Sequence, residues 1–246
     1  MKKILVLTIA LFCFTSKAKL IEIKVKLLPP DTFIYSELNI TKLLTDVGFA
    51  KSYDWLINAG FYDNVTHTIV PVTTVKYGTS SFAPNQHFNG IYTDTTGNNY
   101  PDSTRQWQVL GQGAIPNFTF MPTNPMPNFT DYSLVTGTVT ISSGVTIPFS
   151  GISNATNVTI IISDGVNQVI EAFPVNNLSS SSRLSSGATL YPTSVTIPSS
   201  DLNVLSPTNN AFINILVSNV DYQVFSGKRM AFIKTFMYKR DRVVIQ

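Results

Sequence analysis

The residues of this chain that could act as acids, bases or nucleophiles are few and scattered. There are two histidines, His67 and His87, and three glutamates, while serine is abundant. No HExxH metal motif, GxSxG nucleophile motif or glycine-rich phosphate loop follows any predicted strand. A serine-histidine-carboxylate triad would need distant residues, and with so many serines no pairing is informative. The sequence therefore predicts a protein that is not an enzyme and holds no cofactor.

One loop carries oxygen atoms of the kind that hard cations bind. Asp94, Asn98 and Asp102 alternate with other polar residues, and calcium takes such oxygens. The segment lacks the glutamate and most of the acids of a calcium loop. A turn at Gly97-Asn98, with side chains that hydrogen-bond the backbone, explains the same residues. We favour the turn and predict no metal ligands.

Aromatic side chains in the first half of the chain suggest a binding surface. Several stand next to Asn, Gln or Asp, and flat rings beside amides can stack on sugar rings and hydrogen-bond their hydroxyl groups. The alternative is that these rings fill a core, as most must. The candidate ligand-binding residues are Tyr62, His87, Phe88, Tyr92 and Tyr100. The partner expected is a glycan or a surface protein.

The first 18 residues have the pattern of a secretory signal peptide. Lys2 and Lys3 precede an apolar run, and the small residues Ser16 and Ala18 suit signal peptidase. Cleavage would remove three of the 17 basic residues and leave 14, which equals the number of acidic residues. A neutral exported chain lacks the positive surface that nucleic acid requires, so we expect no nucleic-acid partner.

The position of the cysteine and the hydropathy of the chain restrict the expected cellular location of the protein. Cys13 is the one cysteine and lies inside the predicted signal, so the mature chain has no thiol or disulfide. The bulky Phe12 before it disfavours lipid attachment. No later apolar run approaches the roughly 20 residues of a transmembrane helix. The expected location is secreted or extracytoplasmic, in the periplasm or at the cell surface.

The rest of the chain has the pattern of short β-strands. Hydrophobic and polar residues alternate from Ile21 to Leu27, and later strands of five to nine residues are separated by turn signals every 8 to 12 residues. The stretch Ser36 to Leu44 fits a short helix or a strand. The proline-rich segment Met121 to Asn128 cannot lie in a central ladder. We predict an all-β fold of two β-sandwich modules, residues 19–130 and 131–246, the second immunoglobulin-like.

Basic residues are concentrated near the end of the chain. Their positions are Lys228, Arg229, Lys234, Lys239, Arg240 and Arg242. The favoured interpretation is protection of an exposed edge strand against pairing with other chains. An anionic partner, such as a surface polysaccharide, is the alternative.

The segment from Trp107 to Phe118, followed by Pro125 and Pro127, resembles uncharacterised secreted two-module β-sandwich proteins of Bacteroidota. Further similarity lies in Ile152-Ser153-Asn154-Ala155 and in Gly227-Lys228-Arg229. This resemblance implies a two-part β fold outside the cytoplasm and supplies no catalytic residue. Many such proteins carry a lipid-attachment cysteine that this chain lacks.

We therefore expect an exported, non-enzymatic β protein that binds glycan or protein. A secreted hydrolase that uses His87 and a carboxylate of the 94–102 loop is one alternative. A sorting module from about Ala211 to the end of the chain is another, because the closing strands weakly resemble those recognised in type IX secretion.

Overall fold

The computed structural model describes residues 6–7, 23–24, 33–66, 68–84, 91–94, 105–148, 151–174 and 194–246. The chain divides into two compact units, Met1–Thr32 and Phe33–Gln246. In the first unit β1 (Val6–Leu7) pairs antiparallel with β2 (Ile23–Lys24), and β2 lies within the strand predicted from Ile21 to Leu27.

The second unit consists mainly of strands with a few helical turns. In chain order its elements are β3 (Ile34–Asp46), β4 (Lys51–Phe61), β5 (Thr74–Tyr77), β6 (Ser80–Pro84), β7 (Ile91–Thr93), β8 (Trp107–Leu110), β9 (Phe118–Phe120), β10 (Asn128–Phe129), η1 (Tyr132–Leu134), β11 (Thr138–Val139), η2 (Ile141–Ser143), β12 (Val145–Pro148), β13 (Ile152–Ser153), β14 (Asn157–Ser163), β15 (Gln168–Pro174), β16 (Ser194–Ile197), α1 (Ser199–Leu202), β17 (Thr208–Phe225) and β18 (Lys228–Ile245). This composition confirms the all-β prediction. Among the described residues, no helix has the length and apolar character that a membrane crossing would require.

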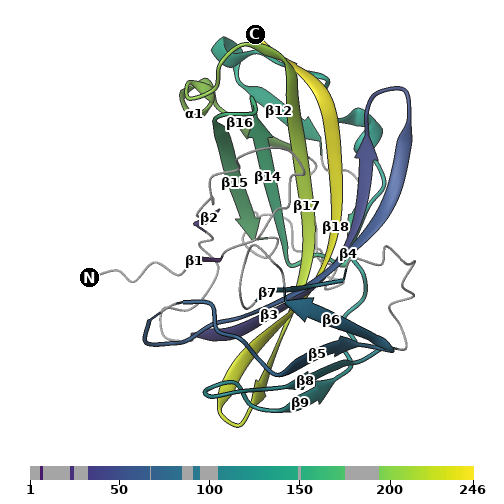
Figure 1. Cartoon of the computed structure of the whole chain (residues 1–246). Coiled ribbons are helices and arrows are strands. Elements are labelled where there is room, and N and C mark those ends of the chain that lie inside the picture. The colour runs from purple at the N-terminus through teal and green to yellow at the C-terminus, as the bar shows by residue number, and fades with distance from the viewer. Residues whose placement is uncertain are drawn as a thin grey trace, which may run out of the picture. The chain divides into compact units, whose positions relative to one another are not determined.

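One large mixed sheet organises this unit. Its strands follow the order β15-β14-β17-β18-β3-β4-β7-β6-β5-β8-β9, and β11 also pairs with β18. The two longest strands, β17 and β18, form an antiparallel hairpin that extends through most of the unit (Figure 1). On its other edge β18 pairs in parallel with β3, from Arg229 with Ile34 to Arg240 with Asp46.

The β17–β18 hairpin follows from its turn and its side chains. Phe225 pairs with Lys228, and the two residues between them, Ser226 and Gly227, have φ values of 50° and 75°. Positive φ at both positions is the two-residue turn whose twist matches that of the flanking strands. β-Branched and aromatic side chains along both strands then favour the extended conformation.

The same face of β18 contributes to two hydrophobic cores. Met230 and Phe232 belong to one buried cluster, with Trp107 and residues of β4, β5 and β8. Phe236 and Tyr238 belong to the other, with residues of β12, β14 and β17. Side chains two apart in a strand share a face, so the residue between these pairs occupies the point where the two cores meet.

That residue is Lys234, which is 3% exposed. Its ammonium group donates hydrogen bonds to the carbonyl oxygens of Pro122, at 3.2 Å, and Asn124, at 2.7 Å. The Asn124 amide donates to the Asn219 carbonyl oxygen, and the Asn219 amide donates to that of Pro125. The proline-rich segment is thereby fixed to β17 and β18 at the junction of the cores. The division into modules at residue 130 stays a prediction, and strands β17 and β18 are common to both cores.

The edge-strand interpretation of the basic C-terminal residues is wrong. β18 lies inside the sheet, between β17 on one edge and β3 and β11 on the other. The basic side chains make internal contacts: Lys228 lies over the Tyr35 ring, Arg229 over Tyr222 and Arg242 over Phe49, Lys239 pairs with Asp241, and Arg240 donates to the Val135 carbonyl oxygen. Charge at these positions stabilises the fold and does not protect a free edge.

The structure also settles the conformation of three shorter segments. Ser36 to Leu44 is strand, because β-branched residues fit the central position of β3. Ser199–Leu202 forms a single helical turn. β4 ends at Phe61, and the Asp63 carboxylate then accepts hydrogen bonds from the Val65 and Thr66 backbone amides in a turn.

Replacing Lys234 with Met tests the junction of the cores. The Lys234→Met variant leaves two buried carbonyl oxygens without their charged donor, and we expect it to lose roughly 2–3 kcal/mol of unfolding free energy. Urea denaturation measures the loss. Lys228→Met, which removes a half-buried lysine from the same strand, is the control. Equal stability of Lys234→Met and the parent protein would refute this role.

Candidate functional site

Of the predicted ligand-binding residues, the two that the structure describes do not lie together. His87, Phe88 and Tyr100 lie outside the described residues, as does His67. Tyr62 and Tyr92 are both described, but they lie on opposite faces of the sheet. Tyr92 pairs with Ala59 and shares its face, whereas the Tyr62 hydroxyl lies over Gly60, the next residue of β4. One small ligand cannot contact both rings.

Tyr92 is a core residue. It is 2% exposed, and its ring meets that of Phe61 edge-on at a centroid distance of 5.9 Å. Its hydroxyl donates to the Val72 carbonyl oxygen at 2.5 Å and accepts from the Val72 amide at 2.8 Å. With ring and hydroxyl both used internally, Tyr92 stabilises the fold and has no free surface for a ligand.

Tyr62 lies beside a buried carboxyl group. Its hydroxyl donates to Oε2 of Glu37 at 3.3 Å, and Glu37 is 5% exposed. Glu37 lies in β3 between Ala231 of β18 and Gly60 of β4, two residues with little or no side chain. Burial raises the Glu37 pKa to about 8, an effect that the Tyr62 hydrogen bond only partly opposes. Glu37 is therefore largely protonated at neutral pH.

The 94–102 loop, for which calcium was weighed against a turn, is described only at its start. The Asp94 amide donates to the Ile57 carbonyl oxygen, which places Asp94 beside β4, and residues 95–104 lie outside the described part. Within the described ranges no group of three or more acidic, histidine or cysteine side chains could hold a metal ion. His87, the base of the hydrolase alternative, is also outside them.

A different set of aromatic residues is exposed together, on the β3–β4 hairpin. Tyr53 and Trp55 are two residues apart in β4, so their rings share one face. Tyr53 is 54% exposed, and Trp55 is half-buried with its inner part against the core. The Lys42 ammonium lies 5.3 Å from the centre of the Tyr53 ring, and Lys42 pairs with Trp55 across the strands.

Tyr132, at the start of η1, extends this set. Its hydroxyl shares a hydrogen bond with that of Tyr53, and this bond together with burial raises the Tyr53 pKa. The Lys51 ammonium lies 4.5 Å from the Tyr132 ring centre. Behind it the ring of Tyr238 stacks on Tyr132 at 5.3 Å and 24°. We call Tyr53, Trp55, Tyr132, Lys42 and Lys51 the aromatic strip.

Buried groups behind the strip fix its position. The Tyr238 hydroxyl donates to Oδ2 of Asp46 at 3.1 Å, and the same oxygen lies 3.8 Å from the Lys51 ammonium. This contact and burial together raise the Tyr238 pKa to about 12, with burial the larger cause. The rings of the strip are thus held in place before any ligand binds.

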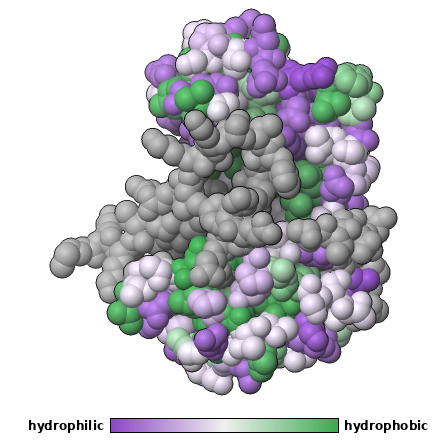
Figure 2. All heavy atoms as spheres, in the orientation of Figure 1, coloured by the Kyte–Doolittle hydropathy of each residue, from purple (hydrophilic) through white to green (hydrophobic). Residues whose placement is uncertain are grey.

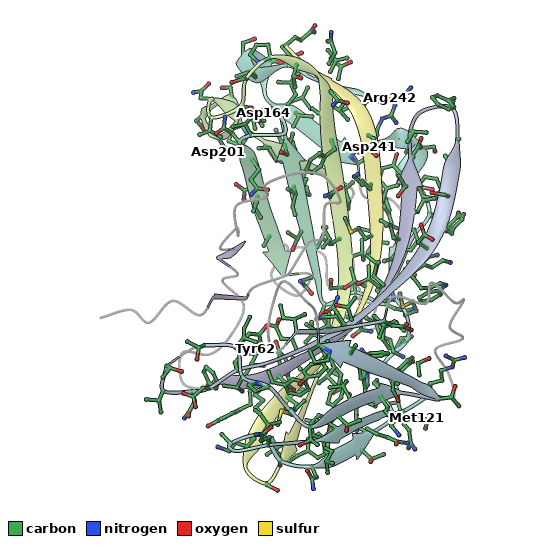
Figure 3. All side chains as sticks on the ribbon, viewed as in Figure 1. Tyr62, Met121, Asp164, Asp201, Asp241 and Arg242 are labelled. Atoms are coloured by element: carbon green, nitrogen blue, oxygen red, sulfur yellow. The ribbon has the colours of Figure 1, made fainter. Side chains whose placement is uncertain are left out.

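The strip stands near the outer end of the hairpin. Hydrophobic side chains gather at the hairpin tip, at the upper right in Figure 2, where Phe49 is 77% exposed. The Arg242 guanidinium lies 4.9 Å from the centre of the Phe49 ring, beside this tip (Figure 3). Tyr62, by contrast, is labelled far below it in Figure 3.

Sequence reasoning missed the strip, although part of its signal was readable. The run Lys51-Ser52-Tyr53-Asp54-Trp55 alternates polar with aromatic residues, the pattern of a strand with one ring-bearing face. The partner Tyr132 could not be found in this way, because it lies 79 residues beyond Tyr53 in the sequence.

A groove of about 530 Å³ offers a second concave surface. It lies over β5, β8 and β9, and Lys76, Gln108 and Asn117 supply polar groups to it. Asn117 already accepts a hydrogen bond from the Gly111 amide, and the aromatic residue of the groove, Phe118, is buried. The groove therefore lacks the exposed rings that make the strip the better candidate.

No protein-family model, curated protein or solved structure matches this chain. The functional interpretation consequently depends on the geometry of its own residues.

The buried carboxyl of Glu37 makes stability depend on pH. Its folded pKa of about 8 exceeds its ordinary 4.5, so the folded state keeps a proton that the unfolded state releases. Unfolding free energy should therefore fall between pH 4.5 and about 8, by at most about 1.4 kcal/mol for each pH unit. Glu37→Gln stays neutral and should remove this component of the slope, which chemical denaturation across the pH range measures.

The exposed carboxyl of Asp54 provides the matched control for this experiment. Asp54→Asn should leave the slope of the parent protein unchanged. A Glu37→Gln variant with the same slope as the parent would show that Glu37 is ionised in the folded protein.

Proposed function

We propose that the protein is an exported, non-enzymatic β protein that binds glycan chains on the aromatic strip. The observation that carries the proposal is the pair Tyr53 and Trp55, an exposed ring and a half-buried ring that share one face of β4 and have lysines beside them. Tyr and Trp, whose rings carry a polar group, are typical of binding surfaces.

The spacing of the two rings suits a repeating ligand. Side chains two apart in a strand are separated by about 7 Å along it. The rings are held by the β3–β4 pairing and, for Tyr53, by the hydroxyl bond with Tyr132. Little entropy is then lost when a sugar ring stacks on them.

The two lysines favour an acidic glycan. In the described part of the chain, Lys42 has no ion-pair partner, while Lys51 lies 3.8 Å from Asp46. Asp54 alternates with Tyr53 and so lies on the opposite face of β4. A uronic acid carboxylate placed over Tyr53 would thus meet the Lys42 ammonium.

The proposal includes the finer features expected from the sequence. We propose export directed by residues 1–18, a location in the periplasm or at the cell surface, and two β-sandwich modules, residues 19–130 and 131–246, the second immunoglobulin-like. The two separate hydrophobic cores and the position of the proline-rich segment between them support the division into modules. A surface protein as ligand is the alternative that the binding test addresses.

The test measures binding of the purified protein to a soluble polyuronate and to a neutral glucan by titration calorimetry. We expect the polyuronate to bind, and Tyr53→Ala and Trp55→Ala each to weaken binding about tenfold, which corresponds to about 1.4 kcal/mol for a lost ring contact. Lys42→Gln should weaken binding of the polyuronate and leave any binding of the glucan unchanged.

Tyr35→Ala is the matched control. Tyr35 lies in β3 and is partly buried. Like Tyr53 it has a lysine near its ring, with the Lys228 ammonium 4.2 Å from the ring centre, but it lies outside the strip. Its removal should leave glycan binding unchanged once equal folding is confirmed by circular dichroism. Binding of neither polysaccharide, or equal losses for Tyr35→Ala and Tyr53→Ala, would overturn the proposal.

A further inference from the structure

Among the described residues, none pairs with the outer edge of β4 beside the strip. β7 pairs with β4 only from Asn58 to Gly60, and the Asp94 amide adds one bond at Ile57. From Lys51 to Leu56 no described residue pairs with this edge, and residues 51–54 are exposed. Alternate residues of a strand direct their backbone groups to opposite edges. Because the Ile57 carbonyl oxygen accepts from Asp94 on the outer edge, Lys51, Tyr53 and Trp55 also present their amide and carbonyl groups there, as a template for another strand.

This edge is already rigid. All of Lys51–Phe61 pairs with β3, and β3 is in turn paired with β18 as far as Arg240. The hairpin also contacts the end of β18 through Phe49 and Arg242. A partner strand that adds to β4 would therefore pay no ordering cost on this side.

We propose that β4 pairs antiparallel with β4 of a second copy, centred on Tyr53. A two-fold axis perpendicular to the sheet keeps each side chain on its own face. Directly opposite residues also share a face, so the axis must pass beside one residue of β4 and its copy and not between two neighbouring residues. Within the free run from 51 to 56, centring on Tyr53 or on Asp54 gives the longest ladders, of five residues each. Centring on Asp54 sets two carboxylates opposite each other, which is unfavourable.

The Tyr53 register has favourable cross-strand neighbours. Tyr53 lies opposite its own copy, Lys51 opposite Trp55, and Ser52 opposite Asp54. Lysine over an aromatic ring is the same pairing that Lys42 and Tyr53 already make within one chain. A centre at Lys51 would instead oppose two ammonium groups, and centres at Ser52 or at residues beyond Asp54 shorten the ladder.

The pairing would join two aromatic strips. Tyr53 and Trp55 of both copies would then lie in one row across the axis, so that each copy completes a longer site for the other. This consequence depends on the proposed glycan binding, whereas the dimer itself does not. Five residues a side bury less area than a stable interface of roughly 1,200–2,000 Å² requires. We therefore expect a weak, concentration-dependent dimer.

Cysteine cross-linking of the whole protein tests the register. In a Cys13→Ser background, Tyr53→Cys should form a disulfide-linked dimer under mild oxidation, because directly opposite Cα atoms lie about 4.5–5.5 Å apart, within disulfide range. Ser52→Cys should not, since its copy lies two residues further along. The double variant Ser52→Cys with Asp54→Cys should cross-link again.

Sedimentation without any cysteine provides the second measurement. The weight-average mass of the parent protein should rise with concentration, and Tyr53→Lys, which opposes two ammonium groups at the axis, should stay monomeric. Tyr53→Phe should behave as the parent. Cross-linking of Ser52→Cys as fast as Tyr53→Cys, or a parent mass independent of concentration, would overturn the dimer. Neither result would alter the loss of glycan binding expected for Tyr53→Ala, so the two proposals fail separately.

Discussion

The buried ammonium group of Lys234 is the interaction on which the arrangement of the second unit depends. A charged group with 3% exposure must find oxygen partners, and the chain provides them from a segment that cannot itself pair as a strand. Proline leaves carbonyl oxygens free to accept, so the proline-rich segment is suited to this role. The hydrogen bonds that the Lys234 ammonium requires thus hold Pro122 against β18, and the two apolar cores share that strand.

The strip is supported through the same strand. β18 holds β3 by parallel pairing, β3 holds β4, and Tyr238 of β18 supports Tyr132 from behind. The rings that we assign to binding are therefore placed by a rigid ladder and not by a loop. The buried Glu37 belongs to the same ladder but to its other face, where its Oε2 accepts a hydrogen bond from the Tyr62 hydroxyl.

Local sequence patterns predicted the local structure well. The all-β class follows from alternation and turn residues that lie close together in the sequence. The predicted strands of five to nine residues are shorter than β17 and β18, which have 18 residues each. The parallel pairing of β3 with β18 could not be predicted, because it joins residues separated by nearly the whole unit. The edge-strand interpretation of the basic residues failed for this reason: charge next to a strand indicates an edge only when the neighbours of the strand are known. Tyr62 and Tyr92 were grouped by proximity in sequence, whereas the register places them on opposite faces.

The parallel contact between β3 and β18 has a consequence for biogenesis. Ribosomes make β3 early and β18 late, and the sheet has no centre until β18 emerges. Contacts between residues so far apart in the sequence form slowly, because the entropy of loop closure is lost before the contacts stabilise the chain. The central pairing of the sheet can consequently close only after nearly the whole chain has been synthesised.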